Sequence, residues 1–158
     1  MATETKPRTG RNFREAWAVD FSVFLPNRVG QLKELLDMLS SAGLDILGMS
    51  IVESTDWAVI RLVFSQPDRA RSVLRERPLP FTESEVLLVE LATSKSLSEV
   101  CTLLLAAEIS VHFAFPLMVR HDDRPLMVLH VDNNDLARQV LARHGVATVG
   151  DEDLDEIA

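Results

Sequence analysis

The residues best suited to binding chemistry lie in the segment Leu25-Pro26-Asn27-Arg28-Val29-Gly30-Gln31-Leu32, just before a predicted helix. A helix start offers free backbone N–H groups and a partial positive charge, which suit a carboxylate. Gly30 has no side chain and lets a ligand approach the backbone. Asn27 could hold a ligand group or cap the helix, and Arg28 could add a charge-assisted hydrogen bond. The alternative is a purely structural loop, because Asn caps helices and Gly forms tight turns without any ligand.

Histidines and the single cysteine offer weaker candidates for chemistry. The run His121-Asp122-Asp123 and His130 carry metal-binding side chains, but aspartates are common in hairpin turns and no second cluster follows, so we expect no metal site. We expect His112 to be a packed residue of a strand. We expect Cys101 to be a core residue on the apolar face of a helix. The sequence contains no nucleophile–base pair, phosphate loop or dinucleotide motif, so we expect neither an enzyme nor a cofactor.

A regular series of strands and helices must position these residues. Val19, Phe21, Val23 and Leu25 alternate as in a half-buried strand, and the leucines at 32, 35, 36 and 39 line one face of a helix that ends near Gly43. Residues 46–52 and 57–64 read as two strands of a hairpin, and residues 81–91 as a further strand. Between them the run Ser65-Gln66-Pro67-Asp68 predicts a second helix with Ser65 as its cap.

The same order recurs in the second half of the chain. A shift of 67 aligns residues 68–74 with 135–141, where five of seven residues are identical. A shift of 65 aligns the first helix with residues 97–107, so two extra residues are expected in the second hairpin, near His121 to Arg124. The shift of 67 also aligns Glu85 and Leu87 with Glu152 and Leu154. These matches predict an internal duplication, in which residues 79–92 join the halves without a flexible linker.

The order strand–helix–strand–strand–helix–strand resembles the ACT domain, a ferredoxin-like fold that usually binds amino acids. The segment Leu25 to Leu32 is similar to the family's loop before the first helix, where an acidic residue or Asn precedes a glycine and a leucine. The run Ala42-Gly43-Leu44-Asp45-Ile46 looks like the family's junction between this helix and the second strand. The resemblance implies an α+β fold of two ferredoxin-like βαββαβ repeats, at residues 16–84 and 85–158, after a flexible tail of residues 1–15.

The resemblance also implies a ligand and its site. In the family, a free amino acid commonly binds between this loop and the second strand of a neighbouring ACT domain. The expected ligand-binding residues, within the chain or across a homodimer, are Asn27, Arg28, Val29, Gly30, Gln31, His112, Phe113 and Ala114. The second half's loop, residues 92–97, lacks a glycine, and its run Ser96-Leu97-Ser98-Glu99 fits a capping box, so we expect that loop to be structural.

Composition and charge narrow the function further. The 158 residues carry a net charge of −8, with 47% hydrophobic and 25% charged residues, which is typical of a globular protein and unfavourable for binding nucleic acid. No apolar run reaches the roughly 20 residues that span a membrane, and no signal-peptide core is evident, so we expect a cytoplasmic protein. A non-enzymatic amino-acid sensor is the first hypothesis. The second is a regulatory subunit of a biosynthetic enzyme such as acetolactate synthase, whose regulatory subunits look similar in their ACT portion.

Overall fold

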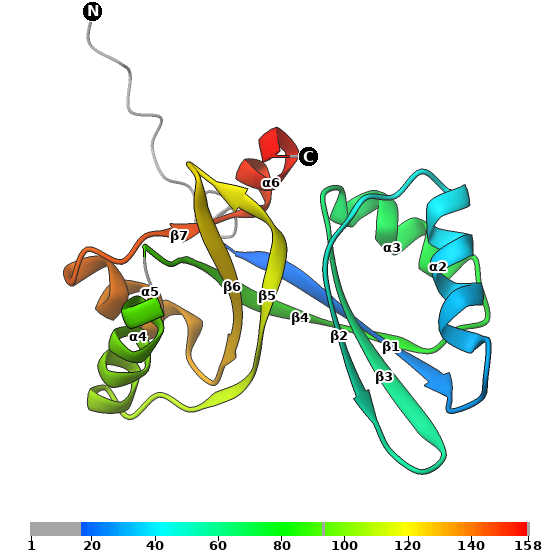
Figure 1. The fold of residues 1–158 in the computed structure, drawn as a ribbon, viewed down its shortest axis with the longest axis horizontal. Helices are drawn as coiled ribbons and strands as arrows, with labels where there is room; N and C mark the ends of the chain where they lie inside the picture. The colour runs from blue at the N-terminus through cyan, green and yellow to red at the C-terminus, as the bar shows by residue number, and fades with distance from the viewer. Residues whose placement is uncertain (1–16, 93, 158) are drawn as a thin grey trace, which may run out of the picture.

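The structure, a computed structural model, describes residues 17–92 and 94–157 (Figure 1). The expected tail of residues 1–15 lies outside the described residues. In chain order the elements are β1 (Ala18–Pro26), α2 (Gln31–Ser41), β2 (Ile46–Glu53), β3 (Trp57–Phe64), α3 (Pro67–Arg75), β4 (Phe81–Glu90), α4 (Ser94–Ala106), β5 (Val111–His121), β6 (Arg124–Val131), α5 (Asn134–Arg143), β7 (Thr148–Val149) and α6 (Asp151–Ile157). None of the described helices is long and apolar enough to cross a bilayer.

The strands form one sheet in the order β2-β3-β1-β4-β6-β5, and β7 also pairs with β4. Strand β4 belongs to both halves: residues 81–86 pair with β1, and residues 87–90 pair with β6. The first lobe therefore has the order β2-β3-β1-β4 and the second the order β5-β6-β4-β7, which is the same arrangement twice. This confirms the predicted α+β fold of two ferredoxin-like βαββαβ repeats. The predicted division at residues 84 and 85 falls inside β4 and stays a prediction.

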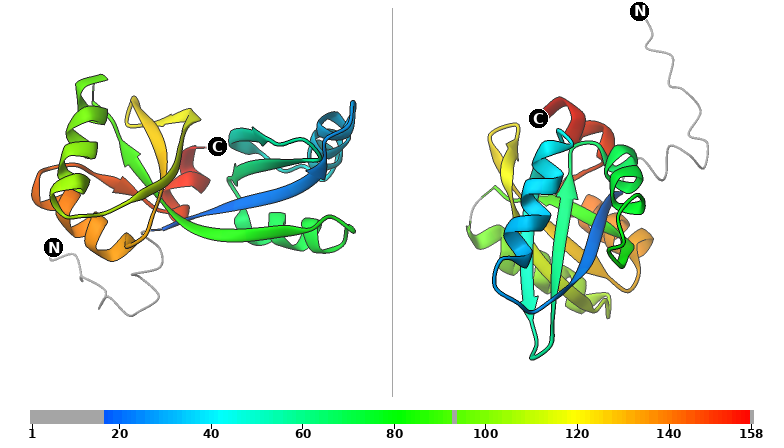
Figure 2. Two further views of the ribbon diagram at one scale, coloured as in Figure 1. Left: turned by 90° about the horizontal axis from the view of Figure 1, so that it is seen from below. Right: turned by 90° about the vertical axis from the view of Figure 1, so that its right-hand side faces the viewer.

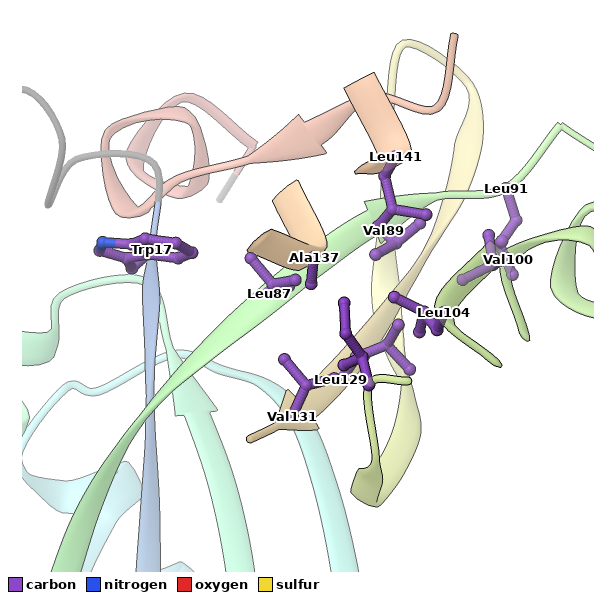
Figure 3. Packing of buried hydrophobic residues seen from close by; sticks show 11 residues of the cluster. Trp17, Leu87, Val89, Leu91, Val100, Leu104, Leu129, Val131, Ala137 and Leu141 are labelled. Carbon is purple, nitrogen blue, oxygen red and sulfur yellow. The ribbon is translucent and has the colours of Figure 1, made fainter. Parts of the chain in front are cut away.

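Each lobe has its own core between its helices and its part of the sheet. In the first lobe, Leu35 and Leu39 of α2 pack with Phe21 and Leu62 of the sheet. In the second lobe, Leu87 and Val89 of β4 point toward α5, as Figure 3 shows. Helices α2 and α3 consequently lie at one end of the molecule and α4 and α5 at the other, with the strands between them (Figures 1 and 2).

A third core lies between the lobes and is made by the sheet faces that carry no α2–α5 helix. Its members come from both lobes and from α6: Ala18, Leu47, Val63, Val86, Leu88, Phe115, Leu117, Leu126, Val128, Val149 and Leu154. In an antiparallel sheet with helices on one face, the other face is open to solvent unless something covers it. The packing of the two lobes buries the apolar side chains that this face would expose in an isolated lobe. Gly48 allows the close approach, since a Cβ there would overlap Cδ2 of Leu117.

The two extra residues of the second repeat lie in β5 and not in the hairpin turn, which corrects the prediction. Pro116 pairs with Met127 but Arg120 pairs with Pro125, so β5 carries two more residues than β6 across this interval. The turn itself is tight, with Asp122 and Asp123 at positive φ. The extra residues form a bulge that includes Leu117, which a strand accommodates by bending locally.

The left-handed conformation predicted for Gly43 after α2 is confirmed. Three other predictions about local structure are wrong. The N-cap of α3 is Gln66, and Ser65 is buried before it. Cys101 is exposed, because Val100 and Leu104 form the buried stripe of α4. Glu152 and Leu154 do not match the strand residues Glu85 and Leu87: they lie in α6, where Leu154 docks into the core between the lobes.

Replacing Gly48 with Ala tests the packing between the lobes. We expect Gly48→Ala to destabilise the protein by about 1–3 kcal/mol, because the new methyl group must displace Leu117 in a closely packed layer. Leu117→Ala alone should cost about 2–5 kcal/mol. Urea unfolding of both single variants and the double variant measures their coupling: Gly48→Ala should cost less once Leu117 is shortened. Strictly additive losses would show that the two residues do not touch.

Candidate functional site

The predicted loop borders a cleft of about 200 Å³ between the start of α2 and the β2–β3 hairpin. Its polar lining comes from Asn27, Arg28, Gln31 and Glu53. Its apolar lining comes from Leu25, Pro26, Leu32, Ile51, Ala58 and Ile60. The cleft thus combines a cation, a carboxylate and an apolar wall within one small volume.

The local backbone explains how the loop presents these groups. Gly30 is the N-cap of α2 at φ +90°, a left-handed conformation that glycine adopts without strain, and no side chain caps the helix start. Asn27 does not cap the helix, contrary to one prediction: its Nδ2 donates a hydrogen bond of 2.9 Å to the carbonyl of Ser54 in the β2–β3 turn. Its backbone N–H donates to the carbonyl of Asp56 at 2.9 Å. These two bonds hold the loop against the hairpin tip.

The structure brings together only part of the predicted site. Asn27, Arg28 and Gln31 line the cleft. Val29 points fully into solvent, at 105% exposure, and Gly30 contributes its backbone conformation. The strand residues His112, Phe113 and Ala114 lie at the start of β5 and do not line this cleft. Sequence reasoning missed Ile51 and Glu53, which the hairpin brings to the loop from the opposite side.

The second repeat's loop differs from its prediction. The helix α4 begins at Ser94, so Ser96 lies inside it and cannot be an N-cap; the predicted capping box is wrong. The residue before Ser94 lies outside the described residues. A cleft of about 340 Å³ in this lobe is lined by residues further along α4 and after α5: Ser98, Glu99, Thr102, Leu103, His144 and Val146.

The strand residues His112 and Phe113 instead belong to a polar seam between the lobes. The guanidinium of Arg61 on β3 lies 4.0 Å from the centre of the Phe113 ring, which joins the two lobes by a cation–π contact. The ring of His130 stacks on Phe113 at 4.8 Å and lies 5.2 Å from that of His112. His112 is exposed, which corrects the prediction of a packed histidine on this strand.

Burial perturbs the ionisable groups of this seam. Asp20 is fully buried on β1 and accepts a hydrogen bond of 2.8 Å from Ser22. Burial raises the pKa of Asp20 to about 6, although the bond from Ser22 and the charge of Arg61 oppose the shift. Burial lowers the pKa of His130, and the neighbouring His112 and Arg61 act in the same direction. The seam therefore changes charge in mildly acidic solution, at the contact between the lobes.

We expect the Asp20→Asn variant to reveal this titration in the free energy of unfolding. The pKa of Asp20 is about 6 in the folded protein and near 3.8 in the unfolded chain. Between these two pKa values the folded state binds more protons than the unfolded chain. The contribution of Asp20 to the free energy of unfolding therefore falls by about 3 kcal/mol as the pH rises from below 3.8 to above 6. The free energy of unfolding of Asp20→Asn should consequently rise relative to that of the wild type between about pH 4.5 and pH 7.5. His130 titrates in both proteins and cancels in the difference.

The control for this experiment is Asp45→Asn, which alters an exposed carboxylate. Its difference from the wild type measures the effect of replacing a carboxylate that is not buried. If the difference between Asp20→Asn and the wild type stays constant as the pH changes, the carboxyl of Asp20 does not titrate as the structure indicates.

Solved structures with the same fold support this architecture. The protein BT0572 from Bacteroides thetaiotaomicron is 22% identical, and the match covers 90% of this chain and 98% of that chain with a TM-score of 0.80. The ligand-free regulatory subunit of aspartate kinase from Thermus thermophilus is 10% identical, over 80% of this chain and 91% of that chain, with a TM-score of 0.53. At these identities the likeness shows the fold alone. A search of curated proteins found no match.

The family is shown by the sequence match itself. The family model described as an ACT domain pair matches residues 18–158, which includes both lobes and the strand that they share. The chain therefore belongs to the ACT domain pair family, whose domains are regulatory modules that bind small molecules.

Proposed function

We propose that this chain is a non-enzymatic regulatory protein that binds a small free amino acid beside the β1–α2 loop. The observation that carries the proposal is that Arg28 and Glu53 both line one cleft of about 200 Å³ that also has an apolar wall. An amino acid carries a carboxylate and an ammonium group on one carbon, and a binding site for it needs opposite charges on two sides.

Each group of the cleft matches one part of such a ligand. Arg28 suits the carboxylate, because a guanidinium makes paired, charge-assisted hydrogen bonds to it. The uncapped start of α2 adds backbone N–H groups with a partial positive charge. Glu53 suits the ammonium group. Leu32, Ile51 and Ile60 then face the ligand's side chain, which favours a small aliphatic amino acid over a charged one.

The size of the cleft supports the same class of ligand. The cleft measures about 200 Å³. Sites for larger ligands usually measure roughly 300–1,000 Å³. The cleft therefore favours a metabolite of amino-acid size over a nucleotide or another large cofactor.

The proposal predicts that aliphatic amino acids raise the melting temperature of the protein. Arg28→Gln should weaken binding about tenfold or more in calorimetry, because a hydrogen bond to a charged group contributes about 1.5–3 kcal/mol. The matched control is Lys33→Gln, an exposed cation on α2 that pairs with Asp37 outside the cleft. This control should bind as the wild type does. Failure of every amino acid to stabilise the wild type would refute the proposal, and so would equal losses in the two variants.

A second candidate function is that of a regulatory subunit of an amino-acid biosynthetic enzyme. Apolar side chains lie exposed around the hairpin tip and the loop, namely Val29, Ile51, Val52 and Trp57, which we call the tip patch. Several exposed apolar side chains at one end of a lobe favour a protein partner. A partner enzyme or a second copy of this chain fits the patch, and in a second copy the residues His112 to Ala114 could approach the loop.

Light scattering of the full chain tests the homodimer. We expect a dimer for the wild type and a monomer for Trp57→Glu, because a charge in the tip patch must be desolvated when the patch is covered. Leu105→Glu is the control, since Leu105 is 77% exposed on α4 of the other lobe. A monomeric wild type would leave a partner enzyme as the occupant that co-purification should then reveal.

A further inference from the structure

Three metal-binding side chains meet where the second hairpin turns. Glu90 lies at the end of β4, His121 at the end of β5, and Asp122 opens the turn to β6. One ligand atom from each of these residues, which we call the hairpin cluster, lies within 4.8 Å of the others. The sequence contains the pair His121-Asp122 but separates Glu90 from it by 31 positions, so only the folded sheet completes the group.

The atoms of the hairpin cluster converge on one nitrogen. The Nδ1 atom of His121 contacts Oε1 of Glu90 and lies 3.8 Å from Oδ2 of Asp122. The other carboxylate oxygen of Glu90 lies 3.7 Å from Nη1 of Arg124, which leaves Oε1 as the oxygen aimed at the histidine. Two carboxylate oxygens of the hairpin cluster thus lie around one imidazole nitrogen.

The charges around this nitrogen favour a cation. The side chain of Glu90 is only 8% exposed, and a carboxylate so buried needs a positive partner. Asp153 of α6 adds a third carboxylate whose charge acts on His121. These carboxylates raise the pKa of His121, and the largest cause is the hydrogen bond that its ring donates to Glu90. Three carboxylates therefore face one arginine and one imidazole, which leaves a negative balance.

The backbone holds the ligands in register. His121 pairs with Arg124 and Glu90 with Leu126, so the end of β4 and the hairpin turn are tied through β6. Asp122 and Asp123 adopt φ of 48° and 62°, which closes the hairpin with two residues. The side chain of Arg120 donates to the carbonyl of Asp123 at 3.1 Å and further fixes the turn. The cluster is therefore positioned by strand pairing and not by a loose loop.

We propose that Glu90, His121 and Asp122 bind a divalent transition-metal ion such as Zn²⁺ through Oε1, Nδ1 and Oδ2. Imidazole nitrogen and carboxylate oxygen are zinc ligands, and bond lengths of about 2.0–2.2 Å require only a small adjustment of these side chains. Water completes the coordination on the exposed side of Asp122.

Calorimetry with zinc chloride on the untagged, chelator-treated full chain tests the proposal, and Co²⁺ absorption provides an independent spectroscopic readout. The wild type should bind one ion, and His121→Ala and Glu90→Gln should each bind roughly tenfold or more weakly. Asp122→Asn keeps the fold, because Asn accepts the left-handed conformation of an exposed turn residue, and should also weaken binding. His144→Gln, an exposed histidine at the end of α5, is the control and should bind as the wild type does.

Two results would overturn the metal site. The first is an absence of saturable uptake by the wild type, which would make the hairpin cluster an ion pair only. The second is undiminished uptake by the folded Asp122→Asn and His121→Ala variants, which would place the ion elsewhere. Amino-acid binding at the β1–α2 cleft is measured separately, so either proposal fails without affecting the other.

Discussion

The arrangement of this protein depends on one strand that pairs with both lobes. Along one edge of β4, the strands β1 and β7 follow each other, and β6 occupies the other edge. Alternate side chains of β4 also serve different cores: Val86 and Leu88 pack between the lobes, whereas Leu87 and Val89 pack under the helices of the second lobe. Val86 to Val89 of β4 are buried on both faces, and Leu88 and Val89 pair with β6 on one edge and β7 on the other, so β4 cannot bend there without breaking several contacts at once. The lobes are therefore set relative to each other by backbone hydrogen bonds and not by a linker.

This constraint explains why the layer between the lobes is apolar in the middle and polar at two ends. Asp20, opposite Ser84, marks one end, and Glu90 marks the other. Ser84 and Glu90 are six positions apart along β4, which corresponds to about 20 Å. Between them, Gly48 lets the sheets approach until Leu117 fills the space, which excludes water from the centre.

Predictions from the sequence succeed within a repeat and fail where the other repeat intervenes. The alternation at Phe21 and Val23 identified the face of β1 that packs on helices, and the leucine spacing identified the buried stripe of α2. The same alternation gave no sign that Asp20 and Ser22 are buried, because their cover comes from the other lobe. Cys101 was misplaced because it matches Leu36, which lies at the margin of its stripe and is only partly buried. The cleft was half predicted: the loop has a recognisable sequence, whereas Ile51 and Glu53 reach it only through strand pairing.

Equivalent positions of the two repeats make different interactions at the hairpin turn. Ser54 and His121 are equivalent under the shift of 67, and each opens the tight turn of its hairpin. In the first lobe, the carbonyl of Ser54 accepts a neutral hydrogen bond from Asn27, just after the lobe's first strand. In the second lobe, the ring of His121 contacts Glu90, near the end of that lobe's first strand. Both links fasten a hairpin turn to the same region of the repeat, so the structural requirement is shared. A neutral link leaves the charges of Arg28 and Glu53 available to a ligand in the adjoining cleft, whereas a charged link concentrates the ionisable groups at the turn itself.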